Sequence, residues 1–592
     1  MTPPHVSSAT SHPSSLRTSF SLFATRPPPL DNMPVPWRRG MPVPYPFYIL
    51  VVCTIAILIL FVQQPELATR AVTSVTAYSP LSFVFFAAKP THEVFAQPTD
   101  LRRRRVAIVG AGASGSAAAF FLSRAAREAE SRAGAPRGSL LDIVVYERED
   151  YIGGRSTVVY PHGDTNLRPV ELGASIFVEA NRNLVKAAKL FGLDVVDPEF
   201  GDTGVAVWDG TQFLFTTSTE KGRWSGWWDT LAALRRYGAL SPMRQRAAVG
   251  ALLKKFARLY DPAWLANRGS VDSVDEFAAS ADLGQALTTR TGEDWAHNVV
   301  KARARWVDEI MEASTRVNYC ADLNEIHALG AAVSLAAGSA YAIAGGNYRL
   351  FEAMLKNSGA DIRLETTVDA IESRDRGFRV TSNHSFTTDD YDEVFFAAPW
   401  HSSPVAKNLS THFTQPIPKQ DYVRLHVTML ATTAPHVDPL YFFRGPDEAI
   451  PGTILTTGAT ARANPGAARP EFQSISYHGE TYQGSGEWVV KIFSKTRLNN
   501  ELLADIFGTD PTWVHRKVWD SYPVLHPTAS FPPMQPMQGF HYLASLEPWV
   551  STMETQTVSA REAVARTVQR WWNIGLGECR AAADSWDMTC GK

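Results

Sequence analysis

Three closely spaced glycines form the part of this chain best suited to binding a dinucleotide. Gly110, Gly112 and Gly115 make the pattern G-x-G-x-x-G between an apolar run at 106–109 and an Ala-rich helical segment. In a strand–turn–helix unit, these glycines permit the tight turn, close backbone approach to a pyrophosphate, and close helix–strand packing. The helix N-terminus then offers free N–H groups to the phosphates. The sequence therefore predicts a dinucleotide site here, and we assign Ser114 to it as well.

An acidic residue and a second glycine pair narrow the expected cofactor to FAD. Residues 141–146 predict another strand, and Glu147 directly after it would bind the ribose hydroxyls of the adenosine half. The pattern E-x5-G-G-R then supplies Gly153 and Gly154 for backbone approach, and Arg155 as a charged fork for the flavin pyrophosphate. A carboxylate at position 147 disfavours NADP, because it would repel the 2′-phosphate.

The chain between these two motifs is longer than usual. The gap between Gly115 and Glu147 exceeds the usual spacing of about 20 residues. The excess at 127–138 is charged and contains Gly and Pro, which predicts a surface loop.

No second G-x-G-x-x-G follows a strand farther along the chain. Since flavoprotein reductases normally have such a site for NAD(P)H, we expect an oxidase, with the substrate as hydride donor and O2 as the reoxidant.

Several later segments are expected to reach the cofactor. Small residues after a short strand would let the chain pass beside the flavin, and a helix that starts near residue 553 would direct N–H groups at it. A paired glycine at 345–346 suggests approach to the flavin ring, with a plain turn as the alternative. The further cofactor-binding residues expected from these features are Gly173, Ala174, Ser175, Gly345, Gly346, Val368, Glu554 and Thr555.

One histidine is the candidate catalytic group. His401 follows an Ala-Ala-Pro-Trp sequence at the end of an expected cofactor-domain strand, where it could orient water or an amino-acid head group. A structural histidine that caps the strand end is the alternative. The chain has neither a Ser-His-Asp constellation nor metal-ligand spacing, so no metal is expected.

The order of these motifs predicts an α/β protein with a discontinuous FAD-binding dinucleotide fold of the two-dinucleotide-binding-domain, amine-oxidase-like type, interrupted by helical and β-rich substrate-binding insertions. Residues 224–260 are rich in Trp and Leu, which favours ordinary helix packing, an apolar substrate tunnel or a membrane-facing lip. The expected division is an N-terminal region at 1–100, FAD-binding parts at 101–220, 331–400 and 541–592, a helical insert at 221–330, and a β-rich substrate part at 401–540.

The first hundred residues indicate targeting rather than enzyme fold. Residues 47–62 are apolar and follow a Pro/Ser-rich, basic stretch, which suggests a signal segment, an uncleaved signal anchor or a buried core element. Two N-x-S triplets, at Asn383 and Asn408, are compatible with a luminal location. Cys579 and Cys590 could close a short loop or remain free thiols. With 592 residues, 45% of them hydrophobic, and a net charge of −2, the chain is globular and no nucleic-acid partner is expected.

The ordered motifs resemble those of the prenylcysteine oxidase family over about residues 104 to 573. Beyond E-x5-G-G-R, the resemblance rests on E-L-G-A-S, S-L-A-A-G-S, G-G-N, A-A-P-W-H and Y-L-A-S-L-E, which stand at 171–175, 334–339, 345–347, 397–401 and 542–547. One departure is Tyr319-Cys320-Ala321, where relatives have Y-G-Q. If that turn contacts the substrate, the specificity would differ.

The resemblance implies a luminal, typically lysosomal or vacuolar, FAD-dependent thioether oxidase. Its substrates would be farnesyl- and geranylgeranyl-cysteine from degraded prenylated proteins, and its products cysteine, an isoprenoid aldehyde and hydrogen peroxide. C1 of the isoprenoid is allylic and α to sulfur, so hydride loss, addition of water and collapse of a hemithioacetal would cleave the bond. The alternatives are another FAD-dependent oxidase of amines or apolar substrates, a non-catalytic prenyl-lipid-binding flavoprotein, and a structural membrane protein with a vestigial fold.

Overall fold

The computed structural model describes residues 97–98, 100–198, 204–218, 225–336, 340–383, 389–580 and 584–591. All of them lie in the unit from Val94 to Lys592. The apolar segment at 47–62, residues His384 and Ser385 of one triplet and the Asn408 side chain of the other lie outside what is described. Among the helices in the described ranges, none combines the length and the apolar character needed to cross a bilayer.

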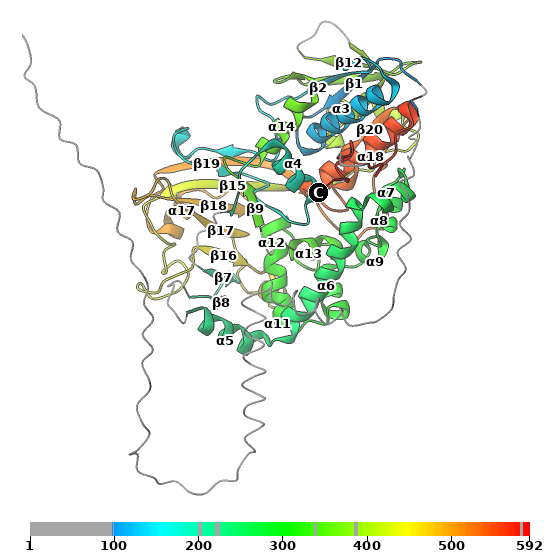
Figure 1. The fold of residues 1–592 in the computed structure, drawn as a ribbon. Coiled ribbons are helices and arrows are strands. Elements are labelled where there is room, and N and C mark those ends of the chain that lie inside the picture. The colour runs from blue at the N-terminus through cyan, green and yellow to red at the C-terminus, as the bar shows by residue number, and fades with distance from the viewer. Residues whose placement is uncertain are drawn as a thin grey trace, which may run out of the picture. The chain divides into compact units, whose positions relative to one another are not determined.

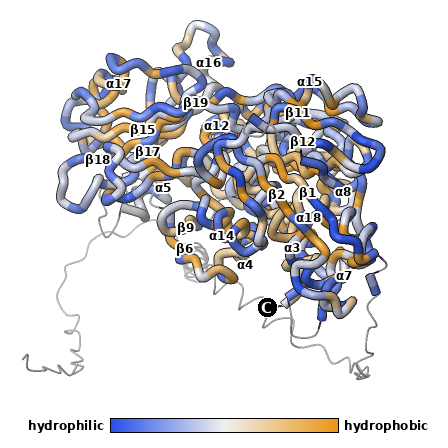
Figure 2. Tube along the Cα trace, turned by 90° about the horizontal axis from the view of Figure 1, so that it is seen from above, coloured by the Kyte–Doolittle hydropathy of each residue, from blue (hydrophilic) through white to orange (hydrophobic). Residues whose placement is uncertain are grey.

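A parallel five-stranded sheet in the described residues forms the base of the dinucleotide fold. Its order is β10-β2-β1-β14-β20, and all four pairings are parallel. The central strands are hydrophobic (Figure 2), as expected for strands covered on both faces. Helices α3, α14 and α18 pack together beside this sheet (Figure 1). The strands are β1 (Arg104–Val109), β2 (Leu141–Tyr146), β10 (Asp361–Arg363), β14 (Glu393–Phe396) and β20 (Phe540–Tyr542), and the helices are α3 (Ala113–Ala133), α14 (Tyr348–Ser358) and α18 (Met553–Trp572).

At residues 127–138 the structure differs from the sequence prediction. We expected a surface loop there, but α3 continues to Ala133 and ends only at Gly134, which has φ +64°. Ala129 and Glu130 are buried on the inner face of the helix. The Glu130 carboxylate accepts a hydrogen bond from the backbone N–H of Leu140 (3.2 Å), which fixes the return of the chain to β2.

A second sheet, of seven strands, lies apart from the parallel sheet in the described unit. Its order is β19-β15-β18-β17-β16-β7-β8. β7 and β8 fall in the range expected for the first FAD-binding part, yet β7 pairs with β16 through buried apolar residues such as Ala206 and Ile454. The strands are β7 (Val205–Trp208), β8 (Phe213–Thr216), β15 (Tyr422–Thr432), β16 (Thr453–Thr456), β17 (Ser474–Glu480), β18 (Trp488–Ser494) and β19 (Trp513–Pro523).

Helices that follow β8 form the insert drawn in green in Figure 1. They are α5 (Ser225–Tyr237), α6 (Leu240–Phe256), α7 (Pro262–Arg268), α8 (Val274–Ser280), α9 (Gln285–Thr288), α10 (Gly292–Asp294), α11 (Ala304–Trp306), α12 (Glu312–Tyr319) and α13 (Ala328–Ser334). α12 packs against β16, so the insert adjoins the seven-stranded sheet.

Smaller elements connect these parts. They are α4 (Arg182–Phe191), α15 (Ala406–Leu409), α16 (Ala459–Ala463), α17 (Asn500–Phe507), β3 (Val158–Val159), β4 (Val170–Glu171), β5 (Phe177–Val178), β6 (Val195–Val196), β9 (Ala340–Ile343), β11 (Val368–Ser373), β12 (Phe378–Ser382) and β13 (Asp389–Tyr391).

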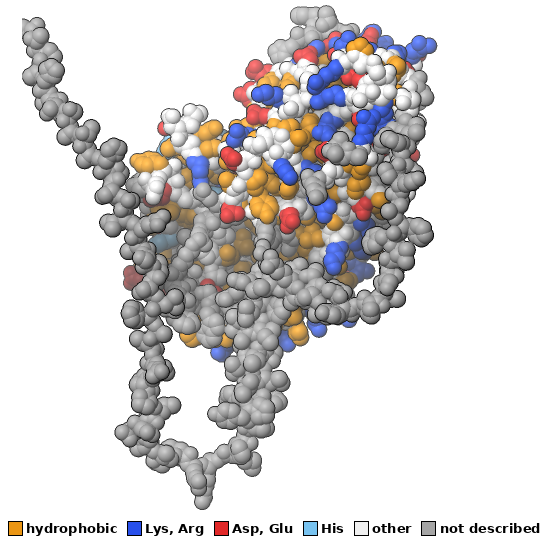
Figure 3. Space-filling model, in the orientation of Figure 1, with side chains coloured by type: hydrophobic (Ala, Val, Ile, Leu, Met, Phe, Trp, Pro, Cys, Tyr) orange, Lys and Arg blue, Asp and Glu red, His pale blue; other side chains and the backbone are white. Residues whose placement is uncertain are grey.

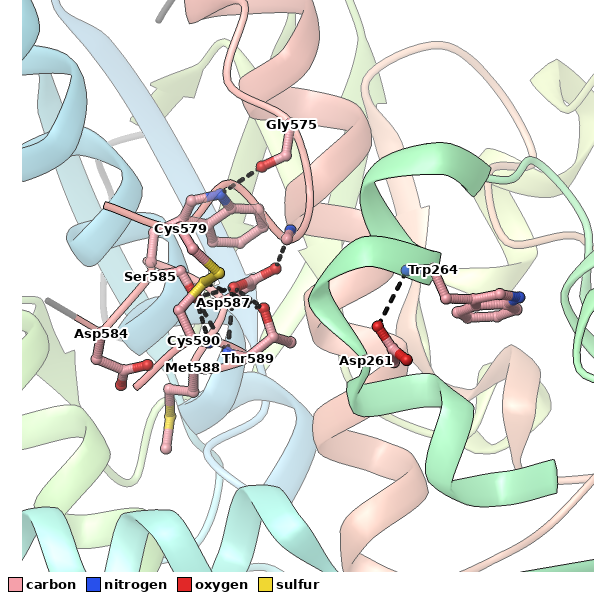
Figure 4. Close-up of a disulfide and its surroundings, with 12 residues drawn as sticks. Asp261, Trp264, Gly575, Cys579, Asp584, Ser585, Asp587, Met588, Thr589 and Cys590 are labelled. Atoms are coloured by element: carbon pink, nitrogen blue, oxygen red, sulfur yellow. Dashed lines mark hydrogen bonds between the residues drawn. A yellow bond between two sulfur atoms is a disulfide. The ribbon is translucent and has the colours of Figure 1, made fainter. Parts of the chain in front are cut away.

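The C-terminal loop is closed by a disulfide between Cys579 and Cys590, whose Cα atoms lie 5.4 Å apart. Figure 4 shows the buried Asp587 carboxylate beside this bridge, where it accepts hydrogen bonds from Thr589 Oγ1 (2.7 Å) and the Gly577 N–H (2.7 Å). Lys186 of α4 donates to the Cys590 carbonyl (2.9 Å). The disulfide therefore secures a loop that packs on the dinucleotide fold, and of the two states left open by the sequence it is the one present.

Candidate active site

A cavity of about 880 Å³ is lined both by the glycine loops after β1 and β2 and by apolar side chains of the helical insert. This volume lies in the upper part of the range for ligand pockets. Twelve of the expected cofactor-binding residues line it: Gly110, Gly112, Ser114, Glu147, Gly153, Gly154, Arg155, Gly173, Ala174, Ser175, Val368 and Glu554.

The first glycine loop has no room for a side chain at Gly110 and Gly115. Gly110 has φ +105°, and a Cβ there would lie 2.9 Å from the Ala397 carbonyl oxygen. A Cβ on Gly115 would overlap the Gly110 carbonyl, so this glycine lets α3 approach β1. Gly112 differs, because its Cβ position is open, with no neighbour nearer than 3.9 Å. It caps α3, whose first turn has no acidic residue. This helix end can therefore receive an anion from the cavity.

Glu147 lies at the end of β2 with its carboxylate fixed by the backbone. Oε2 accepts from the Ala111 N–H (2.7 Å) and Oε1 from the Glu149 N–H (3.0 Å). The side chain is buried and lines the cavity. Each carboxylate oxygen can accept more than one hydrogen bond, so the group remains able to bind hydroxyls of a ligand.

The second glycine loop packs backbone-to-backbone on the first. The Gly153 N–H donates to the Ala111 carbonyl (3.0 Å), and a Cβ on Gly154 would lie 3.3 Å from Gly112 Cα. Arg155 follows in this loop, but its guanidinium forms an ion pair with the buried carboxylate of Glu547. We expected a pyrophosphate ligand for Arg155. The side chain lines the cavity, so this role stays a prediction, but its charge is already paired with Glu547, because a buried carboxylate requires a partner.

A buried lysine from the seven-stranded sheet reaches the same cavity. Lys491 of β18 donates from Nζ to Ser175 Oγ (2.8 Å) and to the Glu171 carbonyl (3.1 Å). Burial lowers the pKa of Lys491 to about 8. Burial also raises the pKa of Glu171 to about 7, although the Asn347 N–H donates to its Oε1 (2.5 Å). Lys491 and Ser175 line the cavity and form a polar corner in a lining that is otherwise mostly apolar, whereas Glu171 lies behind them and is not part of that lining.

Glu554 lines the cavity, but its carboxylate has structural partners. It accepts hydrogen bonds from the N–H groups of Asn183 (2.9 Å) and Leu184 (3.1 Å), and so caps the N-terminus of α4. The Tyr260 hydroxyl donates to the same carboxylate (2.5 Å). Burial raises the pKa of Glu554 to about 7. Thr555, expected beside the cofactor, makes a capping box with Thr552 and does not line the cavity.

Three other expected residues lie away from the cavity. His401 is exposed, and its Nε2 lies 2.9 Å from the Pro418 carbonyl oxygen. It lies in a short turn after β14, so this structure does not place the candidate catalytic group in the site. Gly345 and Gly346 have φ +82° and +119° and form a turn before α14. Of the two alternatives for this pair, the structure has the turn. A Cβ on Gly346 would contact Tyr348 and Val158 rather than a ligand.

The helical insert supplies the apolar half of the cavity. Its α6 presents one face, spaced as in an amphipathic helix, and the following helices add further aliphatic side chains. These residues are Val249, Leu252, Leu253, Phe256, Leu283, Leu329 and Val333. Tyr319 and Tyr522 also line the cavity, with their rings packed edge to face at 5.3 Å.

Comparison with known proteins identifies the family. The family model for prenylcysteine lyase matches residues 219–577. The chain belongs to the prenylcysteine lyase family. A Rossmann-like NAD(P)-binding model matches residues 108–189, which hold both glycine loops. The resemblance inferred from the motifs is therefore confirmed.

Relatives of this family member cover most of its length. Farnesylcysteine lyase of Arabidopsis thaliana is 25% identical over 476 residues, which is 78% of this chain and 87% of the relative. Human prenylcysteine oxidase 1 is 24% identical over 488 residues, or 79% of this chain and 89% of the relative. A solved putative protoporphyrinogen oxidase from Exiguobacterium sp. 255-15 superposes with a TM-score of 0.51 at 14% identity, covering 79% of this chain and 99% of the other. This likeness confirms the predicted fold class.

The part of the site that is built by long-range contacts leaves no motif in the sequence. Lys491 lies in a mostly apolar strand with no motif around it, and its Ser175 partner is 316 residues away. The apolar face of α6 was visible as periodicity, but that pattern alone does not distinguish core packing from a cavity wall. Tyr319 was noted only because its neighbour Cys320 departs from the family pattern.

Proposed function

We propose that this protein is an FAD-dependent oxidase that cleaves the thioether bond of farnesyl- and geranylgeranyl-cysteine. The observation that best supports this proposal is the family match over residues 219–577, a range that contains the apolar walls of the cavity. Named relatives act on farnesylcysteine or prenylcysteine. The matching Rossmann-like model and the flavin-oxidase fold support a flavin cofactor, and the E-x5-G-G-R pattern makes FAD the specific proposal.

The residues at the glycine loops fit this cofactor. Gly112 and the α3 N-terminus would receive the pyrophosphate, and the Glu147 carboxylate would accept the ribose hydroxyls. The backbone around Val368, which lines the cavity, would lie along the adenine. A bound flavin supplies a two-electron acceptor for the hydride of the substrate and passes those electrons to O2.

Protein side chains would orient the prenylcysteine. The apolar residues of α6 and α13 would take the isoprenoid tail, since burying each CH2 group contributes about 0.8 kcal/mol. The Lys491 ammonium, exposed to the cavity beside Ser175, would pair with the carboxylate of the cysteine head. Arg155 is already paired with Glu547, so it would position the loop rather than bind this head group.

The overall reaction is balanced without a nucleophilic side chain. Prenylcysteine, O2 and water give an isoprenoid aldehyde, cysteine and hydrogen peroxide. C1 loses a hydride, water adds to C1, and the C1–S bond breaks with return of a proton to sulfur. The protein therefore needs to hold C1, admit one water and exclude others, which a cavity of this mixed lining can do.

We further propose a luminal, lysosomal or vacuolar location. The Cys579–Cys590 disulfide is compatible with an oxidising secretory route. Glu171 and Glu554, with pKa values of about 7, favour folding at acidic pH. The apolar segment at 47–62 would direct the chain into that route, either as a cleaved signal or as an anchor. The N-x-S triplets at Asn383 and Asn408 would then be available for glycosylation.

Product analysis tests the proposed reaction. Purified full-length protein with FAD is given S-farnesylcysteine, and farnesal, cysteine and peroxide are quantified against O2 consumed. We expect equimolar amounts of all three. S-dodecylcysteine, a saturated thioether, is the matched control, because it lacks the allylic stabilisation of C1. Putrescine tests the amine-oxidase alternative. Turnover of putrescine, with none of S-farnesylcysteine, would contradict the proposal.

A further inference from the structure

The first two helices of the insert expose large apolar side chains to solvent. On α5 these are Trp228, Leu231 and Leu234, with 59%, 43% and 46% of their surface exposed. On α6 they are Leu240 and Met243, with 55% and 57% exposed. Both sets have the three-residue spacing that aligns side chains along one side of a helix. We call these five residues the α5–α6 patch.

Cationic side chains surround the patch. A basic segment at 301–305 lies against the start of α6, since the Arg244 side chain donates to the Lys301 carbonyl (2.7 Å) and the Arg303 backbone N–H donates to Ser241 Oγ (3.0 Å). In Figure 3, hydrophobic and Lys/Arg side chains are visible at the lower edge of the described part, where Figure 1 places α5 and α11. The exposed cations are Arg235, Arg244, Arg246, Lys301, Arg303 and Arg305.

Two acidic groups near the patch in the described part of the chain already have hydrogen-bond partners, and one of them is paired with an arginine. Glu309 binds Arg236 through both carboxylate oxygens, at 2.6 and 2.8 Å, and also accepts from the Tyr237 hydroxyl. Asp229 accepts from the Ser218 backbone and hydroxyl. Within the described residues, Arg235, Arg244, Arg246, Lys301 and Arg303 form no ion pair. The patch therefore combines apolar side chains with a net positive rim.

We propose that the α5–α6 patch docks the protein on an anionic lipid surface. Exposed Trp and Leu side chains on helices with basic borders are the composition of helices that lie in the membrane interface. The positive rim matches the charge of anionic lipid headgroups, each basic residue contributing roughly fivefold to partitioning. The opposite face of α6 lines the cavity through Val249, Leu252 and Leu253, so the docked helix borders both lipid and cavity. This inference stands independently of the reaction proposed above.

A site-specific probe tests this in the full chain. Residues 47–62 could themselves insert into lipid, so total vesicle binding is not the readout. Cys320 is buried and Cys579 and Cys590 are bridged. With Cys53→Ser in all variants, an environment-sensitive fluorophore is attached at Leu240→Cys or, as control, at Leu440→Cys. Leu440 is also exposed (61%) but lies beside the seven-stranded sheet.

Vesicles of phosphatidylcholine alone and with phosphatidylserine are compared. We expect the probe at 240 to shift to the blue and to be quenched by brominated lipid only on the anionic vesicles, while the probe at 440 remains unchanged. Arg235→Gln, Arg244→Gln and Arg303→Gln together should lower this response roughly 100-fold in lipid concentration. The matched triple Arg103→Gln, Lys407→Gln and Lys419→Gln should leave it unchanged.

Three results would overturn the proposal. The first is an equal response at 240 and 440. The second is a response at 240 that is the same on neutral and anionic vesicles. The third is a probe at 240 that is already in an apolar environment without vesicles, which would show the patch covered by another segment of this chain or by a second copy. A peroxide assay on the same samples distinguishes these results from failure of the proposed reaction.

Discussion

The Nζ of Lys491 donates a 2.8 Å hydrogen bond to Ser175 Oγ, and this contact joins the seven-stranded sheet to the chain beside the glycine loops. It brings a buried ammonium into a cavity whose other wall is apolar. A prenylcysteine has the same division between a charged head and an apolar tail. This correspondence is the basis of the orientation proposed for the substrate.

Replacing Lys491 should therefore weaken substrate binding more than turnover. A charge-assisted hydrogen bond contributes about 1.5–3 kcal/mol, so Lys491→Met should raise KM about 10–100-fold. Because the pKa of Lys491 is lowered to about 8, the wild-type KM should rise as pH increases through 8, and the variant should lose this inflection. Steady-state peroxide assays from pH 6 to 10 measure both effects. Lys491→Arg keeps the charge and should move the inflection above pH 10; a variant profile identical to wild type would refute the role.

Glu554 should make the protein more stable in acid. Its pKa is about 4.5 in the unfolded chain and about 7 when folded, so protonation favours the folded state. This contribution is complete below pH 4.5 and is lost as pH rises through 7, a decline of roughly 3 kcal/mol. Glu554→Gln keeps an acceptor for Asn183 and Leu184 and should flatten the decline. Melting temperatures from pH 4.5 to 8.5 test this, with the exposed Glu448→Gln as control. Parallel curves for Glu554→Gln and wild type would rule it out.

Gly112 and Gly115 should respond differently to the same substitution. A Cβ at 112 meets no protein atom within 3.9 Å, so Gly112→Ala should change unfolding free energy by less than about 1 kcal/mol. It should nonetheless lower FAD affinity at least about tenfold if the pyrophosphate approaches there. Gly115→Ala would overlap the Gly110 carbonyl and should destabilise the fold by about 1–3 kcal/mol or more. Thermal unfolding and flavin titration of both variants distinguish the two effects. Unchanged flavin affinity in Gly112→Ala would place the pyrophosphate elsewhere.

Leu253 tests the apolar half of the cavity. Leu253→Gln places an amide against the expected isoprenoid tail. It should raise KM for S-farnesylcysteine about 5–30-fold, because burying an uncompensated polar group costs about 1–2 kcal/mol. Ala251→Gln on the exposed side of the same helix is the matched control and should leave KM within twofold. Steady-state assays in detergent keep membrane binding out of the comparison. Equal KM values for the two variants would exclude α6 from tail binding.

Local sequence was sufficient for some elements of the site and insufficient for others. The strand, glycine turn and helix around Gly110 depend on residues close in sequence, so their pattern predicted them. Arg155 and Glu547 are 392 residues apart, and no sequence motif indicates that the two side chains form an ion pair. His401 had a suggestive position after β14, but turn geometry directs it to the Pro418 carbonyl. The fold class could be predicted because its signals are periodic and local, whereas the polar corner depends on tertiary packing.

Anaerobic reduction of the bound flavin tests the central claim most directly. Purified full-length protein carrying FAD is mixed with S-farnesylcysteine in the absence of O2, and absorbance near the flavin maximum is followed. We predict that the yellow colour is lost and that one equivalent of farnesal forms per flavin, with the colour returning when O2 is admitted. A protein that binds FAD and S-farnesylcysteine but keeps its oxidised flavin spectrum would contradict the account.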